Sequence, residues 1–248
     1  MNTFFARFKE NQFVPLGLIL GVAFLVVGII AAWTAVSIKN ASDTLTVTGS
    51  ATTNVSADTA KWTVTANRTA YEAGIPVATE QVLADTKKIV AFFKSAGIPA
   101  DSVVVGAVHT DQDYSYSSDS SAPKRYVVRQ DVTVSSNDPA LIQKLSQDTS
   151  PLTDQGVVLT VLDPQYLLSD LPKYRVSLAG DAMKDAKARA EQLVKDAGQS
   201  VGRLKSASTA AVQVMAANSL DVSDYGTYDT STIDKTVMVS VRATFSVN

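Results

Sequence analysis

Apolar residues form one unbroken block near the N-terminus, and beyond it they alternate with polar residues. The block, Leu16 to Trp33, carries no charge and lies within a longer uncharged run from Asn11 to Ile38. In a helix, a stretch of this length approaches the roughly 30 Å hydrocarbon core of a bilayer. We therefore expect an N-terminal segment 1–13, a transmembrane helix 14–37 and a linker 38–43.

The flanking charges predict the orientation of this helix. Arg7 and Lys9 precede it, and only Lys39 follows closely, so the positive-inside rule places the N-terminus in the cytoplasm and the bulk of the chain outside. A cleaved signal peptide is the alternative, but its apolar region would be shorter, and the best cleavage site, at 35–37, is poor.

Small residues recur along the predicted span. Gly17 and Gly21 form a GxxxG pattern, and Gly28 continues the stripe. Small residues let helix backbones approach closely in lipid, so these three glycines are candidates for oligomerisation. The alternative is that glycine is simply common in membrane spans.

The first half of the polar region predicts strands around one helix. Alternating residues predict a strand from Leu45 to Val55, interrupted at Gly49, and a second strand around Trp62 that pairs back on the first. Apolar residues at spacings of three and four then predict a helix that ends before Gly97. Two more strands are expected, at 103–110 and 125–134.

The second half repeats this pattern. A short helix begins after Asp138, and a strand covers 157–162. Pro172 suits the first turn of the longest helix, which ends at Gly198. Its expected buried stripe comprises Val176, Ala179, Met183, Ala186, Ala190, Leu193, Val194 and Ala197. Strands at 204–214 and 235–247 follow.

Two segments suggest an internal duplication. AFFKSAGIPADSVVVGAVHTDQ and EQLVKDAGQSVGRLKSASTAAVQ both run through a helix, Lys-x-Ala-Gly and a strand, and each leads into a polar loop. We expect one α+β domain over 44–248, with antiparallel sheets, helices packed on one face, and two intertwined halves at about 44–135 and 136–248.

Composition narrows the function classes. The chain of 248 residues has no cysteine, which removes disulfides, thiolate metal sites and cysteine nucleophiles. With Arg7, Lys9, Lys39 and Glu10 set aside, the remaining 19 basic and 23 acidic residues leave a net charge of −4. No basic face is concentrated, so nucleic acid is not an expected partner.

Catalytic and metal sites find weak support. His109 is the single histidine and lies on a predicted strand near Asp111 and Asp113. A hydrolase centred on His109 is conceivable, but the chain has no GxSxG elbow, and an ordinary strand histidine is favoured. We expect no catalytic residue, metal or cofactor.

Two polar loops, 111–123 and 217–233, offer a ligand- or ion-binding alternative. Their oxygen side chains have the spacing of calcium loops: Asp111, Asp113, Ser115, Ser117 and Asp119 in the first, and Asp221, Ser223 and Asp229, with Gly226, in the second. Both loops lack the bidentate glutamate at position 12, where Ala122 and Thr232 stand, so solvated acidic loops are the favoured interpretation. Their tyrosines also suit protein contacts.

The chain resembles the SIMPL-domain family of bacterial proteins, in its membrane-anchored branch. The resemblance covers about 44–248 and rests on VTGSATTNVSADTAKWTV, FFKSAGIPADSV, RYVVRQDVTVSSND, ALIQKLSQ and the segment from DPQYLLSDLPKYRVSLAG to VGRLKSAS. It implies an α+β fold, an envelope location, no assigned catalytic residues and, in some relatives, large homo-oligomeric rings or channel-like particles. Envelope-stress roles are also proposed for the family.

Together these observations predict a single-pass protein of the bacterial cytoplasmic (inner) membrane. Its domain is expected on the periplasmic side and to be non-enzymatic. The expected partners are the lipid bilayer and other copies of the chain, assembled into a ring or cage-like scaffold through exposed strand edges.

Overall fold

The protein is described by a computed structural model that covers residues 13–114, 123–219, 221 and 223–248. Its helices are α2 (Phe13–Ser42), α3 (Ile75–Ser95), α4 (Pro139–Gln147), α5 (Ser150–Thr153) and α6 (Leu171–Lys195), with 3-10 turns η1 (Glu72–Gly74) and η2 (Ala100–Ser102). Its strands are β1 (Thr44–Ser56), β2 (Thr59–Tyr71), β3 (Val103–Gln112), β4 (Arg125–Ser136), β5 (Leu159–Val161), β6 (Gln165–Leu167), β7 (Val201–Thr209), β8 (Gln213–Ala216) and β9 (Asp234–Val247). The predicted α+β class, with an apolar helix before antiparallel sheets, is confirmed.

Helix α2 contains the apolar stretch Leu16–Ala35. Within the described part of the chain, α2 is the one helix long and apolar enough to cross a membrane, and no residue of the stretch Leu16–Ala35 is buried. These properties fit a membrane anchor or a signal sequence. The helix continues to Ser42, through most of the segment expected as a linker. Arg7 and Lys9, which set the expected orientation, lie outside the described residues.

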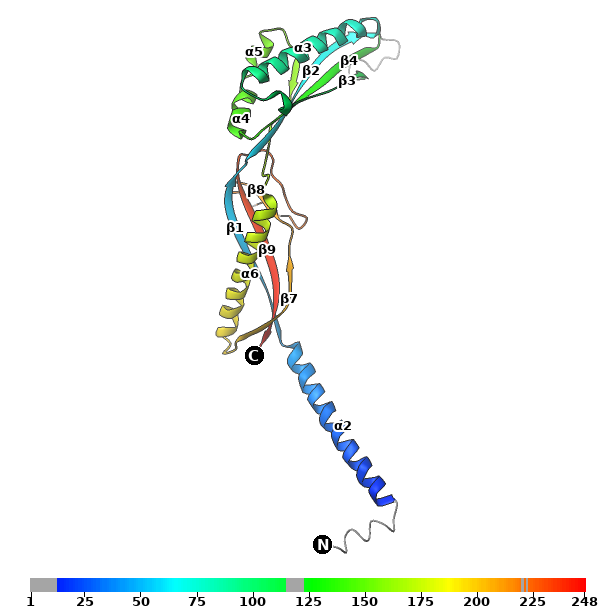
Figure 1. The fold of residues 1–248 in the computed structure, drawn as a ribbon, viewed down its shortest axis with the longest axis vertical. Coiled ribbons are helices and arrows are strands. Elements are labelled where there is room, and N and C mark those ends of the chain that lie inside the picture. Colours follow the sequence, from blue (N-terminus) through cyan, green and yellow to red (C-terminus); the bar gives the residue numbers. More distant parts are fainter. Residues whose placement is uncertain (1–12, 115–122, 220, 222) are drawn as a thin grey trace. The chain divides into compact units, whose positions relative to one another are not determined.

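One sheet has the strand order β3-β4-β2-β5, and β6 also pairs with β2 (Figure 1). Helix α3 packs on β2 and β4 through the predicted apolar stripe, including Val82, Ile89 and Phe93. The rings of Trp62 in β2 and Phe93 pack edge-on, with 5.5 Å between their centroids. The indole N–H of Trp62 donates a hydrogen bond to the carbonyl of Leu162. Large side chains from both layers therefore fill this core.

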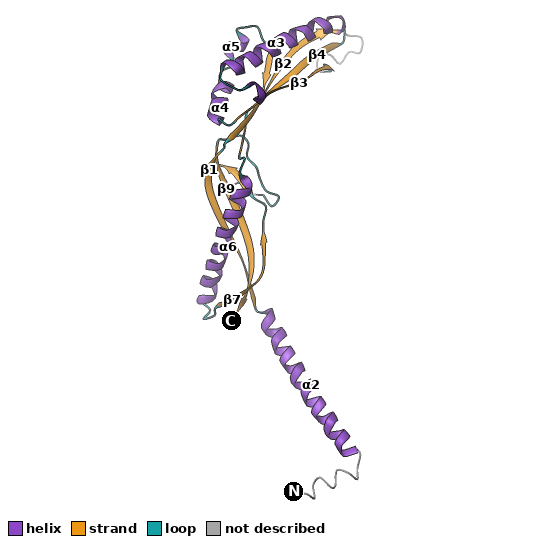
Figure 2. Cartoon of the chain, viewed as in Figure 1, coloured by secondary structure: helices purple, strands orange, loops and turns teal. Residues whose placement is uncertain are grey.

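The other sheet has the order β1-β9-β7 (Figure 2), and β8 also pairs with β9. The expected pairing of β2 with β1 is wrong, because the two strands belong to different sheets. Between them, the amide of Ala57 donates to Ile233 and that of Asp58 donates to Leu167. The chain thus turns between sheets at the point where the sequence suggested a hairpin.

The same strand arrangement occurs in both sheets. In the set β2, α3, β3 and β4, strand β4 is last in sequence and lies between β2 and β3 in the sheet. In the set β1, α6, β7 and β9, strand β9 is last in sequence and lies between β1 and β7. The first set is continuous in sequence and is inserted, along the chain, between β1 and α6 of the second set. This equivalence supports the duplication that the Lys-x-Ala-Gly echoes suggested.

The chain divides into two compact units. The first unit contains residues 1–50, 182–209 and 241–248, and the second contains 51–181 and 210–240. The long elements β1, α6 and β9 contribute one end to each unit. The first unit has its own small core around Val47, Ala186 and Phe245.

Gly49 does not interrupt β1, which is continuous from Thr44 to Ser56. A Cβ placed on Gly49 would overlap the backbone nitrogen of Ala186 and the carbonyl oxygen of Ala182. The glycine therefore marks the place where α6 approaches the strand at backbone distance.

Helix α6 buries a narrower stripe than expected. Its buried residues recur every four positions: Leu178, Ala182, Ala186, Ala190 and Val194. Val176 and Leu193, expected inside, are 76% and 59% exposed. Because the helix touches the sheet through alanines and Gly49, the contact strip is narrow and its flanks stay outside. The strand expected at 204–214 is likewise divided, into β7 and β8.

The helix boundaries follow local signals closely. Asp138 accepts a hydrogen bond from the amide of Leu141, which caps α4 as predicted. Gly97 and Gly198 adopt φ angles of +86° and +72° just beyond α3 and α6, the left-handed conformation that terminates helices.

Candidate functional site

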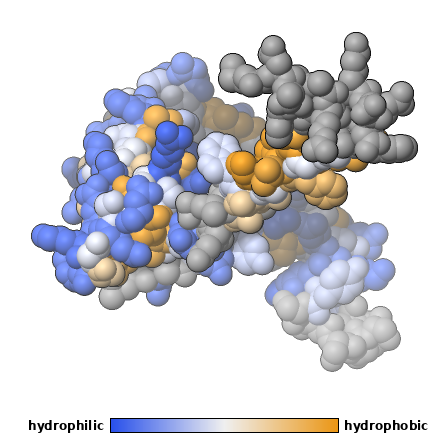
Figure 3. Space-filling model, turned by 90° about the horizontal axis from the view of Figure 1, so that it is seen from below, coloured by the Kyte–Doolittle hydropathy of each residue, from blue (hydrophilic) through white to orange (hydrophobic). Residues whose placement is uncertain are grey.

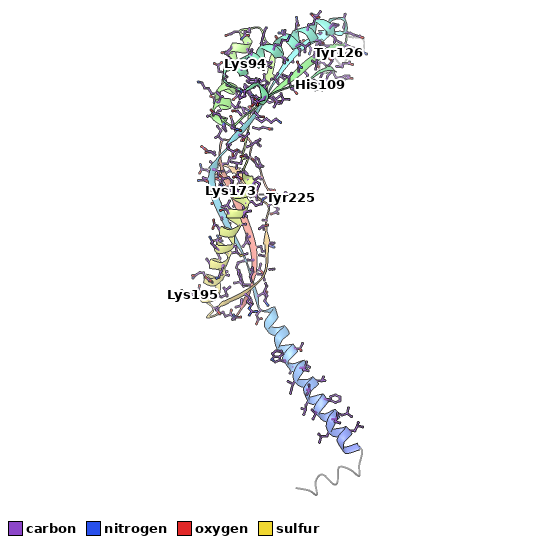
Figure 4. All side chains as sticks on the ribbon, in the orientation of Figure 1. Lys94, His109, Tyr126, Lys173, Lys195 and Tyr225 are labelled. Atoms are coloured by element: carbon purple, nitrogen blue, oxygen red, sulfur yellow. The ribbon has the colours of Figure 1, made fainter. Side chains whose placement is uncertain are left out.

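His109 lies in the edge strand β3, opposite Arg129 of β4 (Figure 4). Its side chain is exposed. Among the described residues it has no hydrogen bond to a serine or a carboxylate, so the geometry brings no Ser–His–Asp arrangement together there. The position fits an ordinary strand histidine.

Arginines hold the described carboxylates of the first polar loop. Asp113 accepts two hydrogen bonds from the guanidinium of Arg125, and Asp111 forms an ion pair with Arg129 at 3.1 Å. These cross-strand pairs close the base of the β3–β4 connection. Ser115, Ser117, Asp119 and Ala122 lie outside the described residues.

The buried amide of Gln213 organises the second polar loop. Its Oε1 accepts hydrogen bonds from the amide and hydroxyl of Thr227, and its Nε2 donates to the carbonyl of Ser223. Gly226 takes a φ of +88° in the turn between these residues. The side chain of Gln213 thus ties the loop to β8 by hydrogen bonds to the backbone of Ser223 and Thr227.

Lys235 is the most unusual polar residue of the second unit, because its side chain is fully buried. Its ammonium donates to the Oδ2 of Asp229 at 3.0 Å and to the Asp229 carbonyl at 2.6 Å. The carboxylate of Asp229 also accepts hydrogen bonds from the amides and hydroxyls of Ser231 and Thr232. A buried charge is tolerated only when paired and hydrogen-bonded in this way.

The second loop also joins the segments where the chain turns between sheets. The amide of Tyr166 donates to Thr230, and the hydroxyl of Tyr228 accepts from the amide of Leu168. Beside them, Asp58 accepts from the amide and hydroxyl of Ser169. The candidate ligand Asp229 therefore serves a structural network, which we call the junction network: Asp58, Tyr166, Ser169, Gln213, Tyr228, Asp229 and Lys235.

Two carboxylates of the junction network have lowered pKa values. Burial by itself raises the pKa of Asp229, but hydrogen bonds from Ser231, Thr232 and Lys235 outweigh it and hold the pKa far below the usual 3.8. At Asp58, burial again acts upward, and hydrogen bonds from Ser169 and Thr59 lower the pKa. Both groups therefore favour the folded state while they are ionised.

Acid is expected to destabilise the protein through the junction network. Since the folded pKa of Asp229 lies below its unfolded value, its contribution is complete above about pH 5 and is lost progressively as pH falls from 3.8 toward the lower folded pKa. We expect the loss to reach about 2 kcal/mol near pH 2. Thermal unfolding followed by circular dichroism should show a flatter acid limb for Asp229→Asn, and an unchanged slope in that variant would contradict the assignment.

The buried carboxylate of Asp85 ties α3 to the sheet beneath it. It accepts two hydrogen bonds from the guanidinium of Arg68, which also donates to the carbonyl of Gly156. Lys88 approaches its other oxygen at 3.6 Å. Arg68 and Lys88 also donate hydrogen bonds to backbone carbonyls of the turn at Gly156. The cluster therefore holds β2, α3 and this turn together.

The outer edge of β3 is open. In the described structure β3 pairs only with β4, and Val104 and Val105 are 64% and 44% exposed. A groove of about 320 Å³ lies between β3 and α3, lined by Leu83, Thr86, Lys87, Val90, Val105 and Gln130. At its floor, Thr86 donates to Gln130, which in turn donates to the carbonyl of Gly106. The groove is thus apolar with a satisfied polar floor.

The three span glycines lie on exposed helix surface. A Cβ placed on Gly17, Gly21 or Gly28 would meet no described atom within 4 Å beyond the backbone of α2 itself. Their surroundings leave room for a second helix, and their role in oligomerisation stays a prediction.

Sequence reasoning missed Lys235 and Gln213. The signal for Lys235 was its register, since it shares alternate positions with Val237, Val239 and Val241, which all face inward. A lysine in phase with a buried face indicates a buried partner. No comparable pattern distinguished Gln213, whose partners lie in an irregular loop.

Comparison with known proteins places most of the domain in one group. The family model described as SIMPL, a protein of unknown function (DUF541), matches residues 45–245. A search of curated proteins finds no match.

Proposed function

Because the chain belongs to the SIMPL family of proteins of unknown function and carries an apolar helix that could span a bilayer, we propose that it is a membrane-anchored, non-enzymatic envelope protein. In this proposal α2 stays uncleaved in the bacterial inner membrane, and the domain self-assembles on the periplasmic side into a large homo-oligomer. A role in envelope stress belongs to the same proposal.

The open edge of β3 carries this proposal. An edge strand exposes unpaired amide and carbonyl groups, and proteins usually blunt such edges with charge, proline or a covering segment. Here Val104 and Val105 leave the edge apolar, and the groove beside α3 offers a place for side chains of an added strand. A strand from a second copy supplies both the backbone partners and the apolar side chains.

Membrane anchoring strengthens weak contacts of this kind. Copies held by α2 share one plane and one orientation, so a contact too weak to form in solution becomes effective through high local concentration. The stripe of Gly17, Gly21 and Gly28 offers a second contact within the bilayer. The rest of the domain is predominantly hydrophilic on the face seen in Figure 3, which favours a few defined contacts over general aggregation.

Charge on the β3 edge is expected to weaken assembly. Val104→Lys with Val105→Lys would place two ammonium groups where a second strand must pair, so we expect the concentration for half-assembly to rise at least about tenfold. Mass photometry of the full chain in mild detergent, with negative-stain imaging, measures this. Val77→Lys is the matched control, because Val77 is 59% exposed on α3. A wild-type protein that is strictly monomeric in both measurements would refute self-assembly.

The contribution of the span is tested separately. Gly17→Leu with Gly21→Leu fills the small-residue stripe and keeps the span apolar, and we expect a partial loss of the largest species. If the oligomer distribution does not change, α2 is a tether and assembly belongs to the domain alone.

A further inference from the structure

One end of the first unit is fixed directly to the anchor helix. The carbonyl of Asp43, the residue after α2, accepts a hydrogen bond from the amide of Val247. Ser200 and Asn248 exchange two backbone hydrogen bonds beside it. The beginning of β1, the turn between α6 and β7 and the end of β9 therefore meet within one residue of Ser42.

Two leucines are exposed at this same end. Leu193, in the last turn of α6, is 59% exposed, and Leu204 of β7, which pairs with Phe245, is 49% exposed. Leu193 also lines a hollow of about 350 Å³ next to Asp43 and Val247. Because α6 contacts the sheet through alanines, Leu193 lies outside the core. Most of its apolar side chain therefore faces solvent in the described unit.

Basic residues lie next to these leucines in the sequence. Lys195, Arg203 and Lys205 are exposed, and no ion pair involves them in the described part of the chain (Figure 4 labels Lys195 at the end of α6). Asp43 and Asp196 at the same end leave a local excess of positive charge. Long basic side chains beside exposed leucines are typical of surfaces that lie in a membrane interface.

The charges of the two units differ in sign. Beyond the anchor, the first unit carries seven basic residues, Lys184, Lys187, Arg189, Lys195, Arg203, Lys205 and Arg242, against four acidic ones, Asp43, Asp185, Glu191 and Asp196. The second unit carries 12 basic and 19 acidic residues. A uniformly acidic domain would be repelled by anionic lipid, whereas this distribution places the basic unit next to the anchor.

The tether leaves little room between this end and a bilayer. The apolar stretch ends at Ala35 and α2 continues to Ser42, so seven helical residues add about 10 Å beyond the hydrocarbon edge. The headgroup layer takes up roughly 5–8 Å of that length. Asp43 therefore lies within about one Debye length of the lipid phosphates at physiological salt.

We propose that this end of the first unit is a membrane-contact surface for anionic headgroups of the bilayer that holds α2. We call it the anchor-end surface and define it as Leu193, Lys195, Arg203, Leu204 and Lys205. The leucines enter the interface while the cations contact phosphates, which limits the swing of the domain about Ser42. The inference rests on the proposed membrane anchoring, but it does not require self-assembly.

The absence of cysteine allows a direct test on the full chain. Gln199→Cys places one environment-sensitive fluorophore beside the anchor-end surface, and the protein is reconstituted into nanodiscs of phosphatidylcholine alone or with about one-third phosphatidylglycerol. We expect the label to shift to the blue and to be quenched by doxyl lipids only with the anionic lipid. Raising the salt to about 1 M, where the Debye length is about 3 Å, should reverse most of the shift.

Charge reversal supplies the matched comparison. Lys195→Glu, Arg203→Glu and Lys205→Glu together should return the label to its neutral-lipid level, since each basic side chain near an anionic surface contributes about fivefold in affinity. Lys94→Glu, Lys124→Glu and Lys144→Glu make the same change in net charge on the second unit and should leave the shift intact. Leu193→Ser with Leu204→Ser should reduce quenching without abolishing salt dependence.

The outcomes separate this inference from the proposed function. A chain that remains in the nanodisc and resists carbonate extraction, but whose wild-type label ignores lipid charge and salt, overturns the membrane-contact surface and leaves anchoring standing. A chain released by carbonate overturns anchoring and this inference together. Oligomer mass, measured on the same samples, reports on assembly alone.

Discussion

Asp229→Ala is expected to lower the free energy of unfolding by about 3–5 kcal/mol, the largest effect of any single substitution considered for this protein. The change leaves the ammonium of Lys235 fully buried with the Asp229 backbone carbonyl as its remaining partner. It also removes the acceptor for Ser231 and Thr232, which hold the second loop in its turn. Uncompensated burial of a charge and loss of the loop therefore act together.

Lys235→Met is expected to cost less, about 1–2 kcal/mol, because the two partners are not equivalent. Asp229 keeps its hydrogen bonds from Ser231 and Thr232, and its side chain is 19% exposed. The double variant should consequently be more stable than Asp229→Ala alone. Urea unfolding of the full chain in detergent, with Lys94→Met as the exposed control, measures all three. Equal costs for the two single variants would contradict this account of the buried pair.

Gly49→Ala is expected to destabilise the first unit by about 3 kcal/mol, at the upper end of the usual cost of overpacking. The new methyl group would overlap backbone atoms of Ala182 and Ala186. No rotamer change relieves a contact with backbone, so α6 must move away from β1. That movement opens the core around Val47 and Phe245.

Gly180→Ala is the matched control with the opposite sign. Gly180 lies in the same helix, and a Cβ there meets no described atom within 4 Å beyond the backbone of α6 itself. Alanine at an open helix position should stabilise by about 0.5–1 kcal/mol. Thermal and urea unfolding of the two variants, side by side, compares the same chemical change in two surroundings. A neutral Gly49→Ala would show that α6 does not approach β1 at backbone distance.

The anchor-end surface and the β3 edge suggest different tasks for the two units. The first unit carries the basic groups and the exposed leucines next to α2, and the second unit carries the open edge strand and its groove. In the proposed function, α2 holds the copies in one bilayer, where the open edge of β3 meets a second copy. Restricted orientation lowers the entropy lost when weak contacts form.

Much of the local structure could be predicted from the sequence, because it depends on neighbours along the chain. The apolar run predicted α2, the 3.6-residue period predicted α3 and α6, and alternation predicted the buried face of β4. Gly97, Gly198 and Asp138 were identified as helix boundaries for the same reason, since caps are satisfied within a few residues.

The candidate site was less predictable, because its partners are distant in sequence. The oxygen spacing of the second loop suggested a ligand site. In the structure, the carboxylate of Asp229 pairs with Lys235, and Gln213 holds the turn before Thr227 by hydrogen bonds. The register of Lys235 on β9 indicated that it was buried, but not what paired with it. Calcium-like spacing alone does not distinguish a cation ligand from a hydrogen-bond acceptor in a folded loop.

The sequence by itself determined the apolar helix that could cross a membrane, the order of the main helices and strands, and the buried faces of α3 and β4. Only the tertiary structure decided that β1 pairs with β9 instead of β2, that Gly49 admits the backbone of α6, and that Leu193 remains exposed. The reason is physical: side-chain periodicity specifies which face leaves water, while backbone amides and carbonyls accept any strand as a neighbour. The choice among strands depends on how distant segments pack around a common core.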